Sequence, residues 1–163
     1  MDRHLEIERK FLVKGRRVGW RRRPSSRIVQ GYFPVASKEL EIRVRRKGAE
    51  HAITIKSGSG RSRLEEEIKI QPSHFRALWP LTRDARISKQ RYRIPFAGRT
   101  IELDVYDGAH RGLITAEVEF KTERQSQAFQ PPAWFGREIT ENHRYANASL
   151  ARRHRIPGRT KRD

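Results

Sequence analysis

Hydrophobic and charged residues alternate along much of this chain, beginning with residues 4–13. In that segment most apolar side chains share one parity, and the other parity carries two carboxylates and an ammonium group: Glu6, Glu8 and Lys10. A period of two residues is typical of a β-strand with one apolar and one polar face. We therefore predict a strand here, with its three charged groups in a row on one side.

The same alternation recurs in later segments, so we expect eight strands in all. The later segments are 28–34, 39–47, 51–57, 62–70, 87–94, 99–106 and 113–122. Mostly short turns join them, which favours antiparallel neighbours in the order of a meander. We expect helices over 72–81, with Ser73 as N-cap, and over 142–153. We expect loops at 14–27 and 125–132. Segment 134–140 fits neither the strand pattern nor the helix pattern.

The composition fits one domain with a partly polar interior. The chain has 163 residues, of which 35% are apolar and 34% are charged. This length suits one domain or one closed barrel. We assign residues 1–153 to a single domain and expect 154–163 to be a basic, disordered tail. No apolar run approaches the ~20 residues of a membrane helix, and no signal peptide is evident, so we expect a soluble cytoplasmic protein.

The charge balance points to polyanionic partners. Lys and Arg number 37 and Asp and Glu 19, for a net charge of +18, which favours binding of RNA, phosphate esters or polyphosphate. Basic runs such as 21–23 and 159–162 lie in a loop and in the tail, where a secondary association with RNA or polyphosphate is expected. The absence of cysteine excludes disulfides, thiolate metal sites and cysteine nucleophiles.

The charged residues at alternate strand positions are sorted by strand. Acids lie on the first and last strands (Glu6, Glu8, Glu117, Glu119), bases on the third, fourth and sixth (Arg43, Arg45, Lys56, Lys89, Arg91), and acids again on the fifth and seventh (Glu65, Glu67, Glu102, Asp104). An antiparallel sheet with one solvated face also carries charges at alternate positions, and that is the simpler interpretation. A solvated face would, however, mix in more Ser, Thr, Gln and Asn. The sorting therefore favours a barrel whose ionic side chains line the bore.

Closure of such a meander would make the first and last strands neighbours, so their glutamates would form one patch opposite a wall of cations. Carboxylate oxygens suit divalent cations, and Arg and Lys suit phosphate groups. The pattern thus predicts a bore that binds a complex of metal and polyphosphate. In this arrangement Ile7 faces outward, and a structure with Ile7 in the bore would overturn it.

Eight short motifs follow one another along the chain. They are Glu6-Ile7-Glu8-Arg9-Lys10, Gln30-Gly31-Tyr32, Glu41-Ile42-Arg43-Val44-Arg45, Thr54-Ile55-Lys56-Ser57-Gly58, Arg63-x-Glu65-x-Glu67, Lys89-x-Arg91-Tyr92, Glu102-x-Asp104 and Glu117-x-Glu119. Near the C-terminus come Gly136-Arg137-Glu138-Ile139-Thr140 and Tyr145-x-Asn147-x-x-Leu150-Ala151. In this order the motifs resemble the CYTH superfamily of triphosphate tunnel metalloenzymes, and in particular bacterial members that act as inorganic triphosphatases.

The resemblance implies a mainly β (α+β) fold: a closed eight-stranded antiparallel barrel with a few peripheral helices and a C-terminal helix. It implies metal ligands at Glu6, Glu8, Glu117 and Glu119, with one or two Mg²⁺ or Mn²⁺ ions. It implies phosphate-binding cations at Lys10, Arg43, Arg45, Lys56, Lys89 and Arg91. Glu65, Glu67, Glu102 and Asp104 match tunnel acids that orient those cations or help to position water. The catalytic residues we expect are Lys10, Tyr32, Glu8 and Glu119, with Tyr32 bonded to Lys10 or to a phosphate.

We expect hydrolysis of inorganic tripolyphosphate to pyrophosphate and phosphate, because the chain is short and has no evident segment for base or thiazole recognition. Thiamine triphosphatase, nucleoside triphosphatase and class IV adenylate cyclase are alternatives on the same scaffold. A barrel that binds polyphosphate or RNA without chemistry is a further alternative. The apolar outer parity, which two short helices would not cover completely, leaves room for a homodimer.

Overall fold

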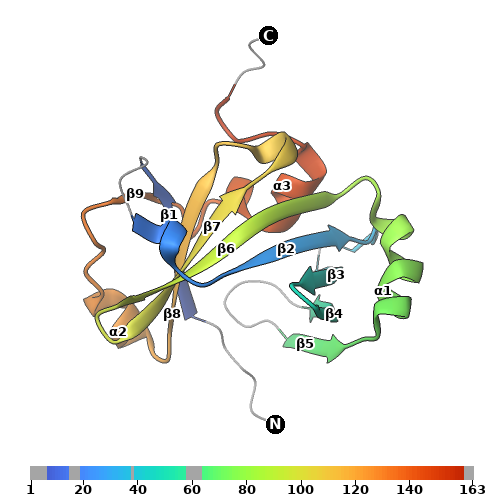
Figure 1. The fold of residues 1–163 in the computed structure, drawn as a ribbon, viewed down its shortest axis with the longest axis horizontal. Coiled ribbons are helices and arrows are strands. Elements are labelled where there is room, and N and C mark those ends of the chain that lie inside the picture. The colour runs from blue at the N-terminus through green and yellow to red at the C-terminus, as the bar shows by residue number, and fades with distance from the viewer. Residues whose placement is uncertain (1–6, 15–18, 38, 58–63, 160–163) are drawn as a thin grey trace.

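The computed structural model describes residues 7–14, 19–37, 39–57 and 64–159, and a nine-stranded antiparallel sheet forms its body (Figure 1). The strands are β1 (Ile7–Val13), β2 (Ser25–Tyr32), β3 (Leu40–Lys47), β4 (Glu50–Ser57), β5 (Leu64–Lys69), β6 (Arg86–Phe96), β7 (Arg99–Tyr106), β8 (Ile114–Phe120) and β9 (Phe135–Glu138). The first eight confirm the strands expected from the alternation, with ends that differ by a few residues. β9 lies in the segment that fitted neither pattern.

Short helices cover parts of the sheet. They are α1 (Pro72–Leu78), α2 (Glu123–Ala128) and α3 (Asn147–Arg153), with 3-10 turns η1 (Gly19–Arg22), η2 (Trp79–Thr82), η3 (Gly108–His110) and η4 (His143–Tyr145). α1 packs on β3 and β4, α2 on β1 and β8, and α3 on β2 and β6 (Figure 1). Within the described ranges, none of the helices has the length and apolar character needed to cross a membrane.

Three helix predictions need correction. α1 begins after Gln71, with Pro72 in its first turn, so Ser73 is not the N-cap; the fixed φ of proline suits that position. α2 occupies part of the expected loop at 125–132, and Thr122 caps it by accepting a hydrogen bond from the Gln125 backbone N–H at 3.2 Å. The expected helix at 142–153 is divided into η4 and α3, because Ala146 between them has extended backbone angles.

The mainly β antiparallel fold is confirmed, but the closed eight-stranded barrel is not, because the described sheet has nine strands and is open. Its order is β5-β4-β3-β2-β6-β7-β8-β1-β9, so β5 and β9 are edges. Within the described ranges β2 pairs with β3 and β6 and not with β1, so the first two strands are not neighbours as a meander would have them. The expected pairing of β1 with β8 is confirmed, with Glu8 opposite Glu119 and Lys10 opposite Glu117.

Apolar clusters lie on both faces of the sheet. The outer cluster includes Phe11, Ile101, Leu103, Val118 and Phe120, and Ile7 packs against it. Ile7 thus packs on the outer face, as expected, and it is also among the residues that line the cavity described below. The inner cluster joins the sheet to η4 and α3 and includes Tyr32, Ile87, Tyr106, Tyr145 and Leu150. α3 therefore covers one end of the inner face.

The C-terminal segment and the outer surface bear on two further predictions. Residues 154–159, where a disordered tail was expected, have defined contacts: Ile156 packs on the inner cluster, and His154 Nε2 lies 3.0 Å from the Asp84 carbonyl oxygen. Residues 160–163 lie outside the described ranges, and the domain boundary at 153 stays a prediction.

On edge strand β5, Leu64 and Ile68 are 60% and 47% exposed. The homodimer likewise stays a prediction.

Candidate active site

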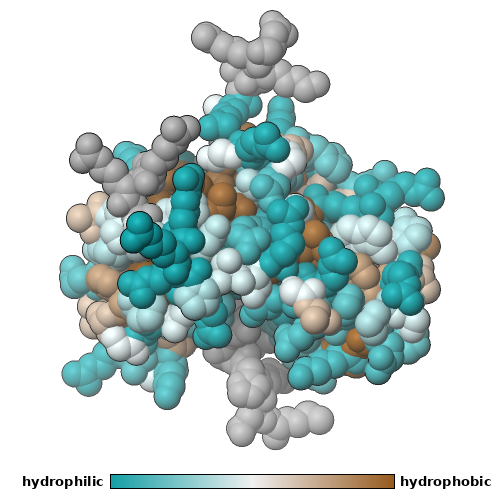
Figure 2. All heavy atoms as spheres, in the orientation of Figure 1, coloured by the Kyte–Doolittle hydropathy of each residue, from teal (hydrophilic) through white to brown (hydrophobic). Residues whose placement is uncertain are grey.

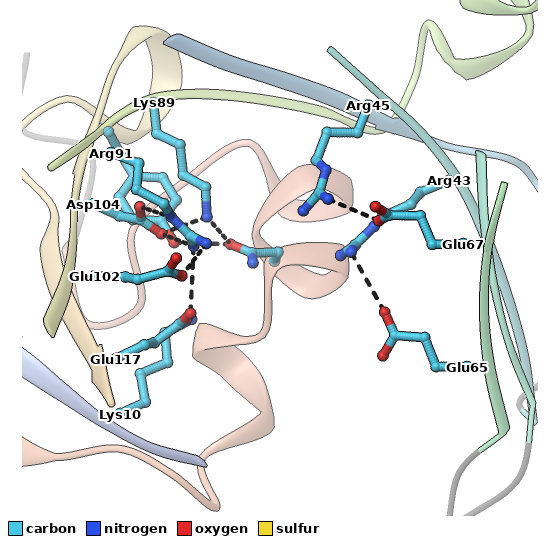
Figure 3. Close-up of polar contacts among 12 residues, drawn as sticks. Lys10, Arg43, Arg45, Glu65, Glu67, Lys89, Arg91, Glu102, Asp104 and Glu117 are labelled. Atoms are coloured by element: carbon cyan, nitrogen blue, oxygen red, sulfur yellow. Dashed lines mark hydrogen bonds and ion pairs between the residues drawn. The ribbon is translucent and has the colours of Figure 1, made fainter. Parts of the chain in front are cut away.

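The ionic side chains of the strands gather around one open cavity of about 1960 Å³ on the inner face of the sheet. Its walls include Glu8, Lys10, Arg43, Arg45, Lys56, Glu65, Glu67, Lys89, Arg91, Glu102, Glu117 and Glu119. Their apolar neighbours in sequence, such as Leu103 and Val118, pack in the outer cluster, as alternation along a strand requires. The prediction that the ionic positions face inward is confirmed. Figure 3 shows two groups of these side chains facing each other, with α3 behind them.

One wall is organised by Arg91. Its Nε and Nη2 donate to the two Asp104 oxygens at 2.7 Å each, Nη1 donates to Glu102, and Nη2 lies 3.4 Å from a Glu117 oxygen (Figure 3). Burial raises the pKa of Asp104, but Lys89 and Arg91 outweigh it, so the net shift is downward. Asp104 is completely buried beneath the cavity wall. It thus holds two cations in place, as expected for an orienting acid.

Lys89 is the most deeply buried cation of this wall, at 1% exposure. Its Nζ lies 2.5 Å from Asp104 Oδ2 and 3.5 Å from Asn147 Oδ1. The pKa of Lys89 is lowered to about 8, mainly by burial and in part by the positive charge of Arg91. Asp104 raises this pKa, but it compensates only in part. Lys89 therefore sits close to its titration point near neutral pH, and a bound anion would favour its charged form.

Lys10 and Glu117 form a neighbouring ion pair, with Lys10 Nζ 2.7 Å from Glu117 Oε1. Burial disfavours both charges, but the combined interactions of each group with its charged and polar neighbours outweigh it. The pKa of Lys10 is consequently raised, and that of Glu117 is lowered with further help from Lys89 and Arg91. Both groups are charged at neutral pH, so Lys10 is available as a cation in the cavity.

The opposite wall is built by β3, β4 and β5. Arg45 Nη2 donates to Glu67 at 2.7 Å, Lys56 Nζ lies 2.7 Å from Glu65, and Arg43 Nη2 lies 3.9 Å from Glu65. The Nε of Arg43 is buried and has no hydrogen-bond partner among the described residues. Since a buried donor without an acceptor is costly, this atom points to a ligand that accepts hydrogen bonds.

Tyr32 lies at the end of β2 that approaches α3. Only 1% of it is exposed, and its hydroxyl accepts a hydrogen bond from Gln30 Nε2 at 2.6 Å. Lys10, one of the two partners expected for Tyr32, is paired with Glu117, and the other expected partner was a phosphate. The catalytic role of Tyr32 stays a prediction. Its hydrogen-bond donor Gln30 belongs to the Gln30-Gly31-Tyr32 motif but was given no role from the sequence.

Two more residues next to Lys89, Asn147 and Tyr106, were not assigned a role from the sequence. Asn147, the first residue of α3, accepts a hydrogen bond from the Tyr106 hydroxyl at 2.8 Å as well as lying near Lys89. Burial raises the pKa of Tyr106, so this hydroxyl stays protonated and can donate. The alternation of β7 had placed Tyr106 on the inward parity, and Asn147 belonged to a C-terminal motif. The local sequence did not predict that α3 places Asn147 next to Lys89.

The predicted metal ligands differ in their surroundings. Glu6 lies outside the described residues. Glu8 and Glu119 are exposed, border the cavity and stand directly opposite each other on β1 and β8. Like charges in such a cross-strand pair repel, and carboxylate oxygens are good ligands for Mg²⁺ and Mn²⁺. The pair therefore fits one side of a divalent cation.

Glu117 fits this set less well, because Lys10 and Arg91 already occupy its oxygens. Within the ranges that the structure describes, no three His, Asp or Glu side chains come together closely enough to hold a metal. The four-glutamate site thus stays a prediction, with Glu8 and Glu119 as its best-placed members.

Comparisons with known proteins agree on one family. A CYTH domain model matches residues 4–154. An inorganic triphosphatase of Nitrosomonas europaea is 45% identical over 148 residues, which cover 90% of this chain and 96% of the relative. An inorganic triphosphatase of Acetivibrio thermocellus is 33% identical over 149 residues, covering 90% and 93%. A crystal structure of an inorganic triphosphatase matches with a TM-score of 0.72 and 42% identity, covering 94% of this chain and 97% of that one.

Proposed function

The chain belongs to the CYTH domain family, and from this premise we propose that it is a metal-dependent triphosphatase that cleaves inorganic tripolyphosphate into pyrophosphate and phosphate. The observation that carries the proposal is the cavity itself, where two walls of cations face each other across a space open to solvent. A linear anion with charges along its whole length matches such a space better than an anion charged at one end.

We assign phosphate binding to the cations of both walls. Lys10, Lys89 and Arg91 would contact the substrate from one side, and Arg43, Arg45 and Lys56 from the other. Most of these cations are held by carboxylates, as Arg91 is by Asp104. They are therefore oriented before substrate arrives, which reduces the reorganisation required in the transition state. The unpaired Nε of Arg43 gains an acceptor when phosphate binds.

Enzymes of this family use a divalent metal, which when bound neutralises phosphate oxygens and acidifies a coordinated water. We propose Mg²⁺ or Mn²⁺, one or two ions, at Glu8 and Glu119, together with Glu6 and Glu117. A carboxylate of this patch accepts a proton from the attacking water. Lys10 lies two positions from Glu8 on the same face of β1, so it binds the phosphate next to the acidic patch.

The reaction is an in-line displacement at the terminal phosphorus. The oxygen of water forms the new bond to phosphorus, the bridging P–O bond breaks, and the pyrophosphate oxygen takes the electron pair. Arg91 and Lys89 stabilise the negative charge that develops on this leaving group. We further propose that the curved sheet surrounds the substrate as a tunnel, with β3 and β4 facing β1 and β6, whether or not the edges β5 and β9 pair.

A substrate panel tests the proposal. Tripolyphosphate, ATP and thiamine triphosphate are each incubated with protein and Mg²⁺ or Mn²⁺, and an EDTA sample serves as control. We expect phosphate release from tripolyphosphate that EDTA abolishes. Formation of cyclic AMP from ATP, without phosphate release from tripolyphosphate, would identify a cyclase instead.

A non-catalytic barrel that binds RNA is the second candidate, because the net charge of +18 exceeds what one substrate requires. The variant Glu6→Ala/Glu8→Ala separates the two. A triphosphatase loses turnover in this variant, whereas an RNA-binding barrel binds RNA at least as tightly, since two negative charges have been removed.

A further inference from the structure

A second concave surface, of about 230 Å³, lies where the chain leaves α3. We call it the arginine pocket, because four of its lining residues are arginines: Arg144, Arg153, Arg155 and Arg159, with Pro157 and Gly158 completing the wall. None of the lining residues is acidic. Among the described residues, none of these arginines forms an ion pair with a carboxylate.

The backbone that carries these arginines is anchored to the domain. After Arg153 the chain leaves α3 through His154, which adopts left-handed angles (φ 50°). Ile156 then packs on the inner cluster, and the Arg159 backbone N–H donates to the Ile156 carbonyl at 3.3 Å. Arg159 Nη1 donates to the Arg111 carbonyl at 3.3 Å. Defined packing and turns thus fix the backbone that places these arginines around the pocket.

Such a gathering of like charges is unfavourable unless an anion is present. In the main cavity, by contrast, Arg45 and Arg91 each form an ion pair with a carboxylate of the protein. Guanidinium groups bind phosphate oxygens through paired, charge-assisted hydrogen bonds. An anion with several phosphate groups would therefore compensate the arginine pocket better than a single carboxylate.

The arginine pocket adjoins the main cavity. Arg144, carried by η4, borders both of them. We propose that the arginine pocket binds phosphate groups of a linear inorganic polyphosphate whose end occupies the main cavity, an inference that rests on the proposed function for the identity of that end. A ligand that reaches both sites binds the second one intramolecularly. Long chains therefore bind more tightly than tripolyphosphate.

Two variants with the same change of charge test this. The pocket variant is Arg153→Glu/Arg155→Glu, and the control variant is Arg46→Glu/Arg76→Glu, at exposed positions on β3 and α1 that line neither the pocket nor the main cavity. Dissociation constants are measured for tripolyphosphate and for a long-chain polyphosphate at one salt concentration. In the pocket variant we expect a loss of about tenfold or more for the long chain and a change under about twofold for tripolyphosphate. The control variant should retain the preference of the wild type for the long chain.

Three results would overturn the inference. One is an equal loss of long-chain affinity in both variants, which would indicate a general effect of charge. Another is a wild type without any preference for the long chain. The third is a pocket that is filled by single-stranded RNA, seen as RNA binding that the pocket variant loses while polyphosphate binding is unchanged. If the pocket variant fails to fold, Arg155→Ala replaces it, with Arg76→Ala as control, and the same comparison applies.

These binding measurements separate the inference from the proposed function. A wild type that releases no phosphate from tripolyphosphate contradicts the proposed function. The chain-length preference and its loss in the pocket variant are still decided by binding alone.

Discussion

Lys10 and Lys89 are both buried in the cavity wall, yet their pKa values move in opposite directions. For Lys10 the combined effect of Tyr106, Glu117 and Asp104 exceeds the cost of burial, so its pKa is raised. Lys89 shares its carboxylate, Asp104, with Arg91, whose positive charge repels it. One cation is therefore permanently charged, whereas the charge of the other depends on pH.

This difference predicts the alkaline limit of activity. kcat/KM reports the titration of the free enzyme, so it should fall as pH rises through about 8, where Lys89 loses its proton. The variant Lys89→Arg keeps its charge at all these pH values. We expect it to be less active at pH 7, because its larger head group is misplaced, but to show no decline near pH 8. The measurement is kcat/KM between pH 6 and 10 at saturating metal, and an unchanged alkaline decline in the variant contradicts the assignment.

The assignment of Glu8 to the metal gives a second prediction for a single residue. Glu8→Gln removes a charged ligand, so the metal concentration that gives half-maximal activity should rise by about tenfold or more. Glu66→Gln is the matched control, because Glu66 is exposed on β5 and does not line the cavity. Metal titrations of activity give the comparison. Equal metal requirements in the two variants would show that Glu8 is not a ligand.

Among the elements, β2 and η2 make an unusually close contact at Gly31. A Cβ atom at this position would lie 2.2 Å from Thr82 Oγ1, far inside contact distance. Gly31→Ala should therefore lower the free energy of unfolding by about 1–3 kcal/mol through overpacking. Gly19→Ala is the control, since its Cβ would meet nothing within 4 Å. Urea unfolding of both variants provides the measurement, and similar midpoints would contradict the close packing.

The elements that the sequence pattern missed are those held by distant partners. β9 has only four residues and no alternation. It is attached to β1, where Arg9 donates two hydrogen bonds to Glu138, at 2.8 and 2.7 Å. This also explains why Arg9 stands on the otherwise apolar parity of β1. α2 did carry a local signal, the capping pair Thr122 and Gln125, but its polar sequence has no apolar period to accompany it.

For the whole molecule, the main electrostatic feature is the net charge of +18. Hydrophilic residues cover most of the face seen in Figure 2, and hydrophobic ones show only in separate patches. A positive field attracts a polyanionic substrate before contact, and dissolved salt screens that field.

Salt should consequently weaken substrate capture more than chemistry. We expect kcat/KM for tripolyphosphate to fall by about threefold or more between ~0.05 and ~0.5 M NaCl, where the Debye length drops from roughly 14 to 4 Å, while kcat changes less. Steady-state kinetics at fixed free metal concentration measure both. A kcat/KM that does not respond to salt would mean that the excess charge plays no part in capture.

The sequence by itself determined which side chains share a face of each strand, because alternation is a local property of extended backbone. That was enough to predict a cavity lined by acids and cations, the pairing of β1 with β8, and the family. Only the tertiary structure decided the pairing of β2 with β6, the place of β9 and the opening between the edges. It also decided which carboxylate holds each cation, and therefore the pKa of Lys89, and it brought the arginines of the pocket together. These features depend on register and burial between residues far apart in the chain, and local patterns do not encode either.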